Sequence, residues 1–153
     1  MPEFGYSIKG LDPDKSVLAS GRDLNISFKE AVEVCRYIKG RKLEEAKKIL
    51  EEVIEGKRAI PYKRFNKKVP HHKYDNSSGP ARYPIKVSKH LLKILESLEA
   101  NAEFKGLDKS KIKIIHCAAQ KGMKIKKYIP RAFGRSSPYF KELVHIEVAG
   151  IEE

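Results

Sequence analysis

The feature that most constrains this chain is a stretch of thirty-three residues, Lys109–Lys141, that contains ten Lys or Arg and no Asp or Glu. Both of its ends are typical of β-strands. Residues 111–119 are rich in β-branched side chains, and residues 141–149 alternate Val or Ile with other residues. Turn-forming residues lie between the two strands, and they are Gly122, Pro130, Gly134 and Pro138.

This pattern predicts one long β-hairpin over residues 109–149, with a tip at about 121–138. Strands of about fifteen residues would project about 50 Å. An isolated two-stranded ribbon is only marginally stable in water. The hairpin therefore needs something outside the chain to lie against, and its positive charge indicates that this partner is a polyanion.

A second basic segment, residues 57–93, has eleven Lys or Arg and a single acid, Asp75. This segment and residues 109–141 each carry a charge of +10, so the rest of this +12 chain carries −8. A surface that serves only solubility mixes the two signs. Segregated positive charge is typical of nucleic-acid-binding proteins, and ordinary solvated surface is the alternative interpretation.

The length of 153 residues fits a single domain, residues 1–153, with a modest core. Cys35 and Cys117 have no paired spacing, which predicts a reducing, cytoplasmic location, and Cys35 lies on an apolar helical stripe as a core residue would. The sequence has no apolar run of about 18 residues and no secretory leader. We therefore expect no membrane span and no secretion.

Three segments have the period of amphipathic helices. The first spans residues 27–40, and Ser27 and Glu30 are predicted to form a capping box at its start. The second spans residues 43–56, and the third spans residues 88–106. Their apolar stripes are Phe28, Ala31, Val32, Cys35 and Ile38; Leu43, Ala46, Ile49, Leu50, Val53 and Ile54; and Leu91, Leu95, Leu98 and Ala102.

Residues 16–26 are predicted to form a strand that is interrupted near Gly21, whereas residues 57–86 show no period. We interpret residues 57–86 as a basic, irregular insert, because a loop of that length inside a small domain indicates function or disorder. The whole pattern predicts an α+β fold. Three helices would pack on a small three-stranded antiparallel sheet, and a long β-hairpin would protrude from it.

The cations and aromatic rings of the two basic segments are the candidate contacts to RNA, because Arg binds phosphate or stacks on bases and aromatic rings stack on bases. Tyr62, Phe65 and Tyr83 lack an apolar period, which favours RNA or partner contact over the core. Tyr139 and Phe140 either contact RNA or cover the sheet. The predicted RNA-binding residues are Lys57, Arg58, Lys63, Arg64, Lys67, Lys68, Lys73, Arg82, Lys86, Lys121, Lys124, Lys126, Lys127, Tyr128, Arg131, Arg135 and Lys141.

Other kinds of site have little support in the sequence. The histidines lack metal-ligand spacing, so we expect no metal. His116 and His145 either face each other across the hairpin or pair with backbone or RNA. The acidic pairs 44–45 and 51–52 have the pattern of a solvated helix face, and no nucleophile elbow, P-loop or dinucleotide-binding motif occurs. We therefore expect no enzyme activity, no cofactor and no small-molecule substrate.

Two motifs resemble a known family when they are taken together. The ANAE run Ala100–Glu103, followed by Gly106–Asp108, precedes a basic hairpin that bears the PRAFGR run Pro130–Arg135. This combination resembles the universal large-subunit ribosomal protein twenty-two family over nearly the whole chain. The insert Arg64–Arg82 and the run Asn101–Asp108 are similar to its archaeal and eukaryotic branch, and we expect an archaeal protein.

The resemblance implies a body that sits on large-subunit rRNA near the exit-tunnel mouth and a hairpin that lines the tunnel. It also implies neighbouring ribosomal proteins near the tunnel and the nascent polypeptide as partners. Ile125 stands where relatives often have Met, and Phe133 stands where a polar or basic residue is usual, so the residue that narrows the tunnel is left open. The implied tunnel-lining tip is Ile125, Pro130, Arg131, Ala132, Phe133, Gly134 and Arg135.

Two functions from different classes follow. The first is a structural constituent of the large ribosomal subunit that binds rRNA, aids its assembly and lines the exit tunnel. We expect that protein, when free, to have a folded body with a mobile tip and a mobile loop over residues 57–86. The alternative is a free-standing RNA chaperone or regulatory RNA-binding protein, which would prefer large-subunit rRNA little over random RNA.

Overall fold

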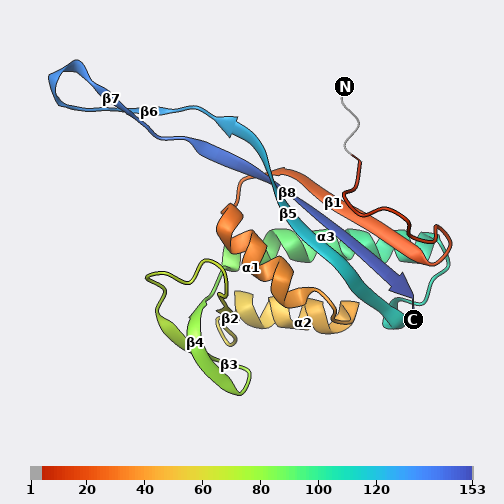
Figure 1. The fold of residues 1–153 in the computed structure, drawn as a ribbon. Helices are drawn as coiled ribbons and strands as arrows, with labels where there is room; N and C mark the ends of the chain where they lie inside the picture. The colour runs from red at the N-terminus through yellow and green to blue at the C-terminus, as the bar shows by residue number, and fades with distance from the viewer. Residues whose placement is uncertain (1–4, 153) are drawn as a thin grey trace.

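A computed structural model describes residues 5–152, and within them three α-helices pack on a main sheet of three antiparallel strands (Figure 1). The predicted α+β class is confirmed. The main sheet has the order β1-β8-β5. Its strands are β1 (Ser16–Leu24), β5 (Ile112–Ile125) and β8 (Lys141–Glu152), and the helices are α1 (Phe28–Ile38), α2 (Leu43–Ile54) and α3 (Ile85–Phe104).

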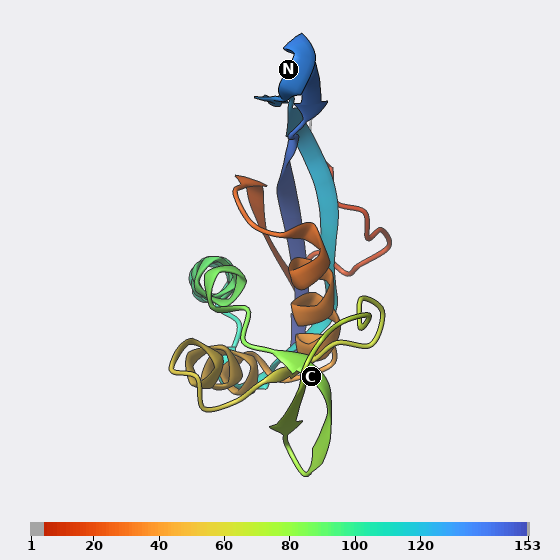
Figure 2. The ribbon, with the colours of Figure 1, turned by 90° about the vertical axis from the view of Figure 1, so that its left-hand side faces the viewer.

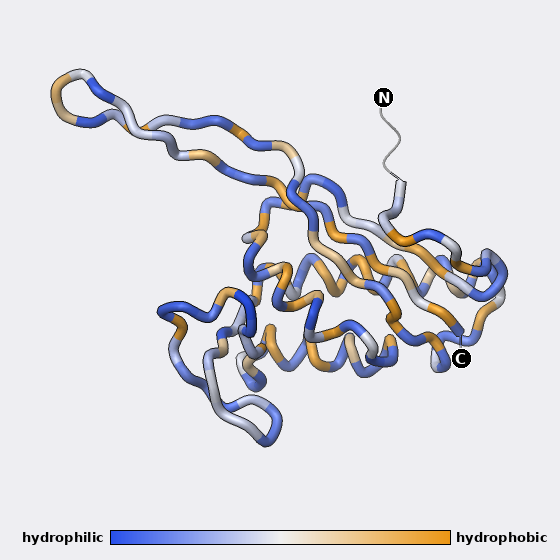
Figure 3. The backbone as a smooth tube through the Cα atoms, viewed as in Figure 1, coloured by the Kyte–Doolittle hydropathy of each residue, from blue (hydrophilic) through white to orange (hydrophobic). Residues whose placement is uncertain are grey.

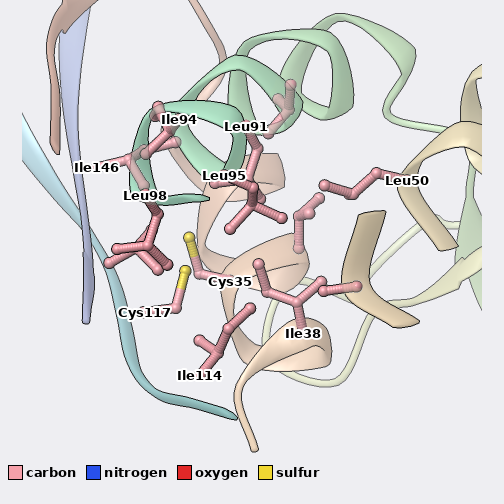
Figure 4. Close-up of a cluster of buried hydrophobic side chains, with 14 of the residues drawn as sticks. Cys35, Ile38, Leu50, Leu91, Ile94, Leu95, Leu98, Ile114, Cys117 and Ile146 are labelled. Atoms are coloured by element: carbon pink, nitrogen blue, oxygen red, sulfur yellow. The ribbon is translucent and has the colours of Figure 1, made fainter. Parts of the chain in front are cut away.

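The core lies between the helices and one face of the main sheet. Helix α3 packs along β1 and α1 packs against β5, while α2 lies beside α3 (Figures 1 and 2). Figure 4 shows Leu91, Leu95 and Leu98 of α3 reaching toward Ile114 of β5 and Ile146 of β8, and all five are fully buried. The predicted stripe of the third helix is therefore confirmed as core. No helix within residues 5–152 has the length and apolar character needed to cross a membrane.

The two cysteines, which are far apart in the sequence, lie next to each other in this core. Cys35 projects from α1 and Cys117 from β5, and their sulfur atoms are neighbours in Figure 4. Contact with the Cys35 thiol and burial raise the pKa of the Cys117 thiol well above its ordinary value. Both residues therefore act as small apolar core groups, as the stripe containing Cys35 predicted.

Helix α1 differs from the prediction in two details. Ser27 does occupy the N-cap position, but its side chain makes no capping hydrogen bond, so the predicted capping box is wrong. The buried face of α1 contains Val34, whereas Val32 is only half-buried. The face is rotated because α1 contacts the segment that follows α2 as well as the sheet.

The segment 57–86 is irregular only in part, notably over residues 62–70, so the prediction of an irregular insert needs correction. It forms a small antiparallel sheet of order β2-β4-β3 beside α1 and α2, with β2 (Ile60–Pro61), β3 (His71–Tyr74) and β4 (Ser77–Arg82) (Figure 1). We call residues 57–86 the insert. Tyr62 is only 5% exposed and belongs to the core cluster, which also corrects the expectation that it lies outside the core.

A buried carboxylate holds the insert against α1. Glu33, on the core-facing side of α1, is 1% exposed. Its two oxygens accept backbone N–H hydrogen bonds from Lys63 at 3.1 Å, Arg64 at 2.8 Å and Phe65 at 2.8 Å. These bonds compensate the charge for its loss of water. The sequence gives no sign of this role, because Glu33 falls between apolar positions of a helical stripe.

A second link joins the insert to the body at the turn between β3 and β4. The Tyr37 hydroxyl donates a hydrogen bond to Asp75 at 2.7 Å. Burial and the adjacent Asp75 carboxylate raise the pKa of Tyr37 to about 12, so the hydroxyl is a donor at neutral pH. Arg58 forms ion pairs with Asp75 at 3.5 Å and Glu52 at 3.0 Å. The insert is thus held at two places, and we expect it to be ordered in the free protein.

The long hairpin is formed by β5 and β8, which have 14 and 12 residues. Their pairing runs from Ile112 opposite Glu152 to Ile125 opposite Lys141. His116 pairs with Ala149 and not with His145, so the two histidines do not face each other. His145 Nδ1 instead accepts the Asp23 backbone N–H at 3.0 Å, which is the predicted backbone alternative.

Beyond the body the hairpin continues as a narrow arm, which we define as residues 121–141. It contains β6 (Tyr128–Pro130) and β7 (Ser136–Pro138), which form a separate two-stranded ladder. Figure 3 shows that the arm is mostly hydrophilic, whereas hydrophobic residues gather in the helices and the main sheet. At its base the Lys121 ammonium lies 5.3 Å from the centroid of the Phe28 ring of α1, but the outer part of the arm packs only on itself and has no layer of helices over it (Figures 1 and 2).

Replacing Glu33 should loosen the insert. We predict that Glu33→Ala lowers the free energy of unfolding by about 3 kcal/mol, because three backbone N–H groups lose a charged acceptor. Urea denaturation measures this change. Glu44→Ala, on the exposed face of α2, is the matched control and should change stability by about 0.5 kcal/mol or less. An equal effect of the two substitutions would contradict the proposed role of Glu33.

Candidate nucleic-acid interface

The outer part of the arm carries exposed cations without acidic partners. Lys126, Lys127, Arg131 and Arg135 are all exposed, and no carboxylate of residues 5–152 lies within ion-pair distance of them. Lys141, at the start of β8, is exposed as well. An unpaired cation on an extended ribbon is free to bind phosphate without breaking an internal contact.

The inner part of the arm is partly neutralised. Lys121 and Lys124 form ion pairs with Glu142, at 3.5 Å and 3.2 Å. The Lys124 ammonium hydrogen-bonded to Glu142 is the largest of the causes that hold the pKa of this carboxyl below its ordinary value. Glu142 lies one residue outside the acid-free stretch, so counting charge within the stretch overstated how many of its cations are available.

The tip of the arm is a tight turn that presents an aromatic ring to solvent. The Arg131 backbone N–H donates to the Arg135 carbonyl at 2.8 Å and closes the turn. Phe133 and Gly134 follow one another with φ of 59° and 65°, in the left-handed region. Gly134 adopts that conformation at little cost, but Phe133 does not. The turn therefore holds Phe133 outward, where its side chain is 98% exposed.

The aromatic residues beside the tip are exposed too. Tyr128 and Phe140 contact each other edge to face, with centroids 5.8 Å apart, and the Lys124 Nζ lies 5.9 Å from the Phe140 centroid. Tyr139 is exposed and its backbone N–H donates to the Lys127 carbonyl at 2.7 Å. Neither Tyr139 nor Phe140 covers the main sheet, because both lie out on the arm. Of the two predicted roles, contact with RNA or cover of the sheet, the geometry supports contact with RNA by stacking.

The insert provides a second basic surface. Seven of the predicted cations are exposed on it or at its boundary with α3, and they are Lys63, Arg64, Lys67, Lys68, Lys73, Arg82 and Lys86. Two others have acidic partners. Arg58 is half-buried between Glu52 and Asp75, and Lys57, which is exposed, pairs with Glu55 at 2.5 Å. The structure thus separates insert cations without an acidic partner in the described residues from those with one.

Lys29 is a candidate that sequence reasoning missed. It lies in the first turn of α1, in a part of the chain whose net charge is slightly negative, so charge counted by segment hides it. The fold brings its ammonium 5.7 Å from the centroid of the Phe65 ring in the insert. Phe65 is half-buried, and Lys29 extends the basic surface of the insert onto α1.

The two basic surfaces leave the body on the same side. In Figure 1 the arm extends toward the upper left and the insert toward the lower left, with α1 between their bases. No group of three or more His, Cys, Asp or Glu suited to a metal ion occurs within residues 5–152. A compact α+β body that presents two cationic surfaces, one of them on an unsupported ribbon, is typical of proteins that bind a folded nucleic acid.

Comparison with known proteins identifies the family. The family model described as Ribosomal protein L22p/L17e matches residues 19–150, so the chain belongs to that family and the resemblance seen in its sequence is confirmed. The Large ribosomal subunit protein uL22 of Thermofilum pendens is 52% identical over 152 residues, which cover 99% of each chain.

Other relatives give the same result. The uL22 protein of Archaeoglobus fulgidus is 50% identical over 148 residues, covering 97% of this chain and 96% of the relative. That of Methanocaldococcus jannaschii is 47% identical over 148 residues, covering 97% and 94%. These matches confirm the archaeal branch of the family.

The salt dependence of RNA binding should distinguish the unpaired cations from the paired ones. We predict that Arg131→Gln combined with Arg135→Gln lowers the slope of log K against log salt by about 1.4 to 1.8, because two phosphate contacts are lost at about 0.7 to 0.9 each. Filter binding to large-subunit rRNA at several KCl concentrations measures the slope. Lys57→Gln, whose partner is Glu55, is the control and should leave the slope unchanged.

Proposed function

We propose that this chain is a structural constituent of the large ribosomal subunit, in which the insert and the arm bind large-subunit rRNA and the arm tip forms part of the exit-tunnel wall. The observation that carries the proposal is the outer part of the arm, a ribbon whose cations have no acidic partner in the described chain and whose residues 126–140 are almost all exposed. Membership of the L22p/L17e family supports a place for that ribbon in the large ribosomal subunit. The role is architectural and needs no catalytic group.

The body, the insert and the arm divide this work. The body has a closed core and folds without RNA, because its helices cover one face of the main sheet. The insert, held by Glu33, presents a preformed basic surface. The arm has few apolar contacts, so RNA phosphates that surround it would fix its path. This division supports docking of the body and insert before the arm is enclosed during assembly.

The tip has the properties expected of a wall that touches a passing polypeptide. Phe133 presents its ring to solvent, and Gly134 has no side chain to obstruct a channel. Arg131 and Arg135 flank the turn and would hold it to RNA on either side. We therefore assign Phe133 to the nascent polypeptide, and the remaining tip residues to the wall: Ile125, Pro130, Arg131, Ala132, Gly134 and Arg135.

Sedimentation tests the proposed function against the RNA-chaperone alternative. A tagged copy expressed in an archaeal host should sediment with large subunits after a high-salt wash, and the purified protein should prefer large-subunit rRNA to random RNA of equal length. A free-standing chaperone would be released by the wash and would bind both RNAs alike. Release together with equal binding would overturn the proposal.

Shortening the arm should spare the body. Ile125 pairs with Lys141, so an Asn-Gly turn in place of residues 126–140 closes the hairpin at a natural register. We predict that this variant melts within about 3 °C of wild type, because the removed residues bury almost nothing. Circular dichroism measures the melt, and chemical probing of assembled subunits should show rRNA changes along the path of the arm. Loss of the cooperative melt would show that the arm belongs to the core.

A further inference from the structure

A hollow of about 460 Å³ lies where the insert meets the start of α1. Four cations line it, namely Lys29 from α1 and Arg64, Lys67 and Arg82 from the insert. Two aromatic residues, Tyr62 and Phe65, line it as well. The volume is within the range of small-ligand sites, and the combination of cations with rings suits a ligand that is both anionic and flat. None of these features is needed for the arm to bind RNA.

Tyr62, which lines this hollow, carries an unsatisfied hydroxyl. Tyr62 is 95% buried, since only 5% of it is exposed, and its hydroxyl has no hydrogen-bond partner among residues 5–152. Burial, with a smaller contribution from Glu30, raises the pKa of Tyr62, so the hydroxyl keeps its proton at neutral pH. A buried donor without an acceptor destabilises the protein, and native structures contain few such groups. The Tyr62 hydroxyl is therefore a hydrogen-bond donor that lacks an acceptor in the described part of the protein.

The wall beside Tyr62 is a ring flanked by charge. The guanidinium of Arg64 lies 5.4 Å from the centroid of Phe65, and the Lys29 ammonium lies 5.7 Å from it. Glu33 binds the backbone N–H groups of both Arg64 and Phe65, so the backbone that carries the wall is fixed before any ligand arrives. Unpaired bases in RNA complexes stack on aromatic rings and on Arg guanidinium planes.

The charges of the hollow favour a phosphate-bearing ligand. Arg82 makes one long contact, 3.5 Å, to the Lys68 carbonyl, and Lys67 is exposed without an acidic partner in the described chain. Glu30 is the one carboxylate at the hollow. It would repel a phosphate placed beside it, but it can accept a hydrogen bond from an exocyclic amino group or a ribose 2′-hydroxyl.

We propose that this hollow binds one unpaired nucleotide of large-subunit rRNA. Its base would lie against Arg64 and Phe65, the Tyr62 hydroxyl would donate to an acceptor on the base, and Arg82 and Lys67 would hold its phosphates. This inference rests on the proposed function and adds to it a base-reading site that is separate from the arm. An acidic side chain of a neighbouring protein would use the cations but would leave the flat wall unused.

Chemical probing of complexes with archaeal large-subunit rRNA tests the proposal with matched tyrosine variants. Wild type should protect one unpaired base, and both Tyr62→Phe and Phe65→Leu should remove the protection of that same base. Tyr62→Phe should weaken rRNA binding about fivefold, as expected for one lost hydrogen bond. Tyr74→Phe, on a half-buried tyrosine of β3 in the same insert that does not line the hollow, should change neither property.

The melting temperature of the free protein separates a ligand role from a structural one. Because the Tyr62 hydroxyl lacks a partner, Tyr62→Phe should melt at or above the wild-type temperature while binding rRNA more weakly. A lowered melting temperature, or unchanged protection of every base in Tyr62→Phe and Phe65→Leu, would overturn the proposal. The Asn-Gly arm variant should keep the protected base. Loss of rRNA preference by wild type itself would instead overturn the proposed function on which the inference rests.

Discussion

The buried carboxylate of Glu33 is the interaction on which the basic surface of the insert depends. A charge that is 1% exposed is tolerated because three consecutive backbone N–H groups, from Lys63 to Phe65, surround its oxygens. The same bonds fix the backbone of a segment that carries the basic surface of the insert. One residue of α1 thus fixes the backbone of a polar segment at Arg64 and Phe65.

The arm follows the opposite principle. Its outer cations have no acidic partner in the described chain, and its residues bury almost no apolar area. The body holds the base of the arm through the pairing of β5 with β8 and through Glu142, which neutralises Lys121 and Lys124 where the arm begins. Repulsion between the cations of the arm is therefore weakest near the body and strongest toward the tip. Under the proposed function, an rRNA environment would supply the missing counter-charge.

The helices and the hairpin could be predicted from the sequence because their patterns repeat. Leu91, Leu95 and Leu98 keep the helical period, and Val144, Ile146 and Val148 of β8 recur at every second residue. The sheet of the insert could not be predicted, because β2, β3 and β4 are short and β4 contains Gly79 and Pro80, which count against a strand. Pairing between short strands supplies order that local preference does not.

The sequence predicted the arm residues of the candidate site better than the residues whose roles depend on contacts between distant segments. Cations of the arm such as Lys126 are exposed in the structure as the sequence indicated, since nothing in an extended ribbon can bury them. Lys29, Tyr62 and Glu33 gained their roles only through contacts between α1 and the insert, which are distant in the sequence and carry no motif. The partners of Arg58 likewise become visible only when β3 and β4 place Asp75 beside it.

Hydrogen exchange measured residue by residue tests the central claim, that the insert is ordered by the body whereas the arm is ordered by RNA. In the free protein the amides of Lys63, Arg64 and Phe65 should exchange slowly, since each donates to the buried Glu33 carboxylate. The amides of Lys126 and Lys127 should exchange freely until large-subunit rRNA is added and should then slow. Fast exchange at residues 63–65 in the free protein, or slow exchange in the arm before RNA is present, would contradict the account.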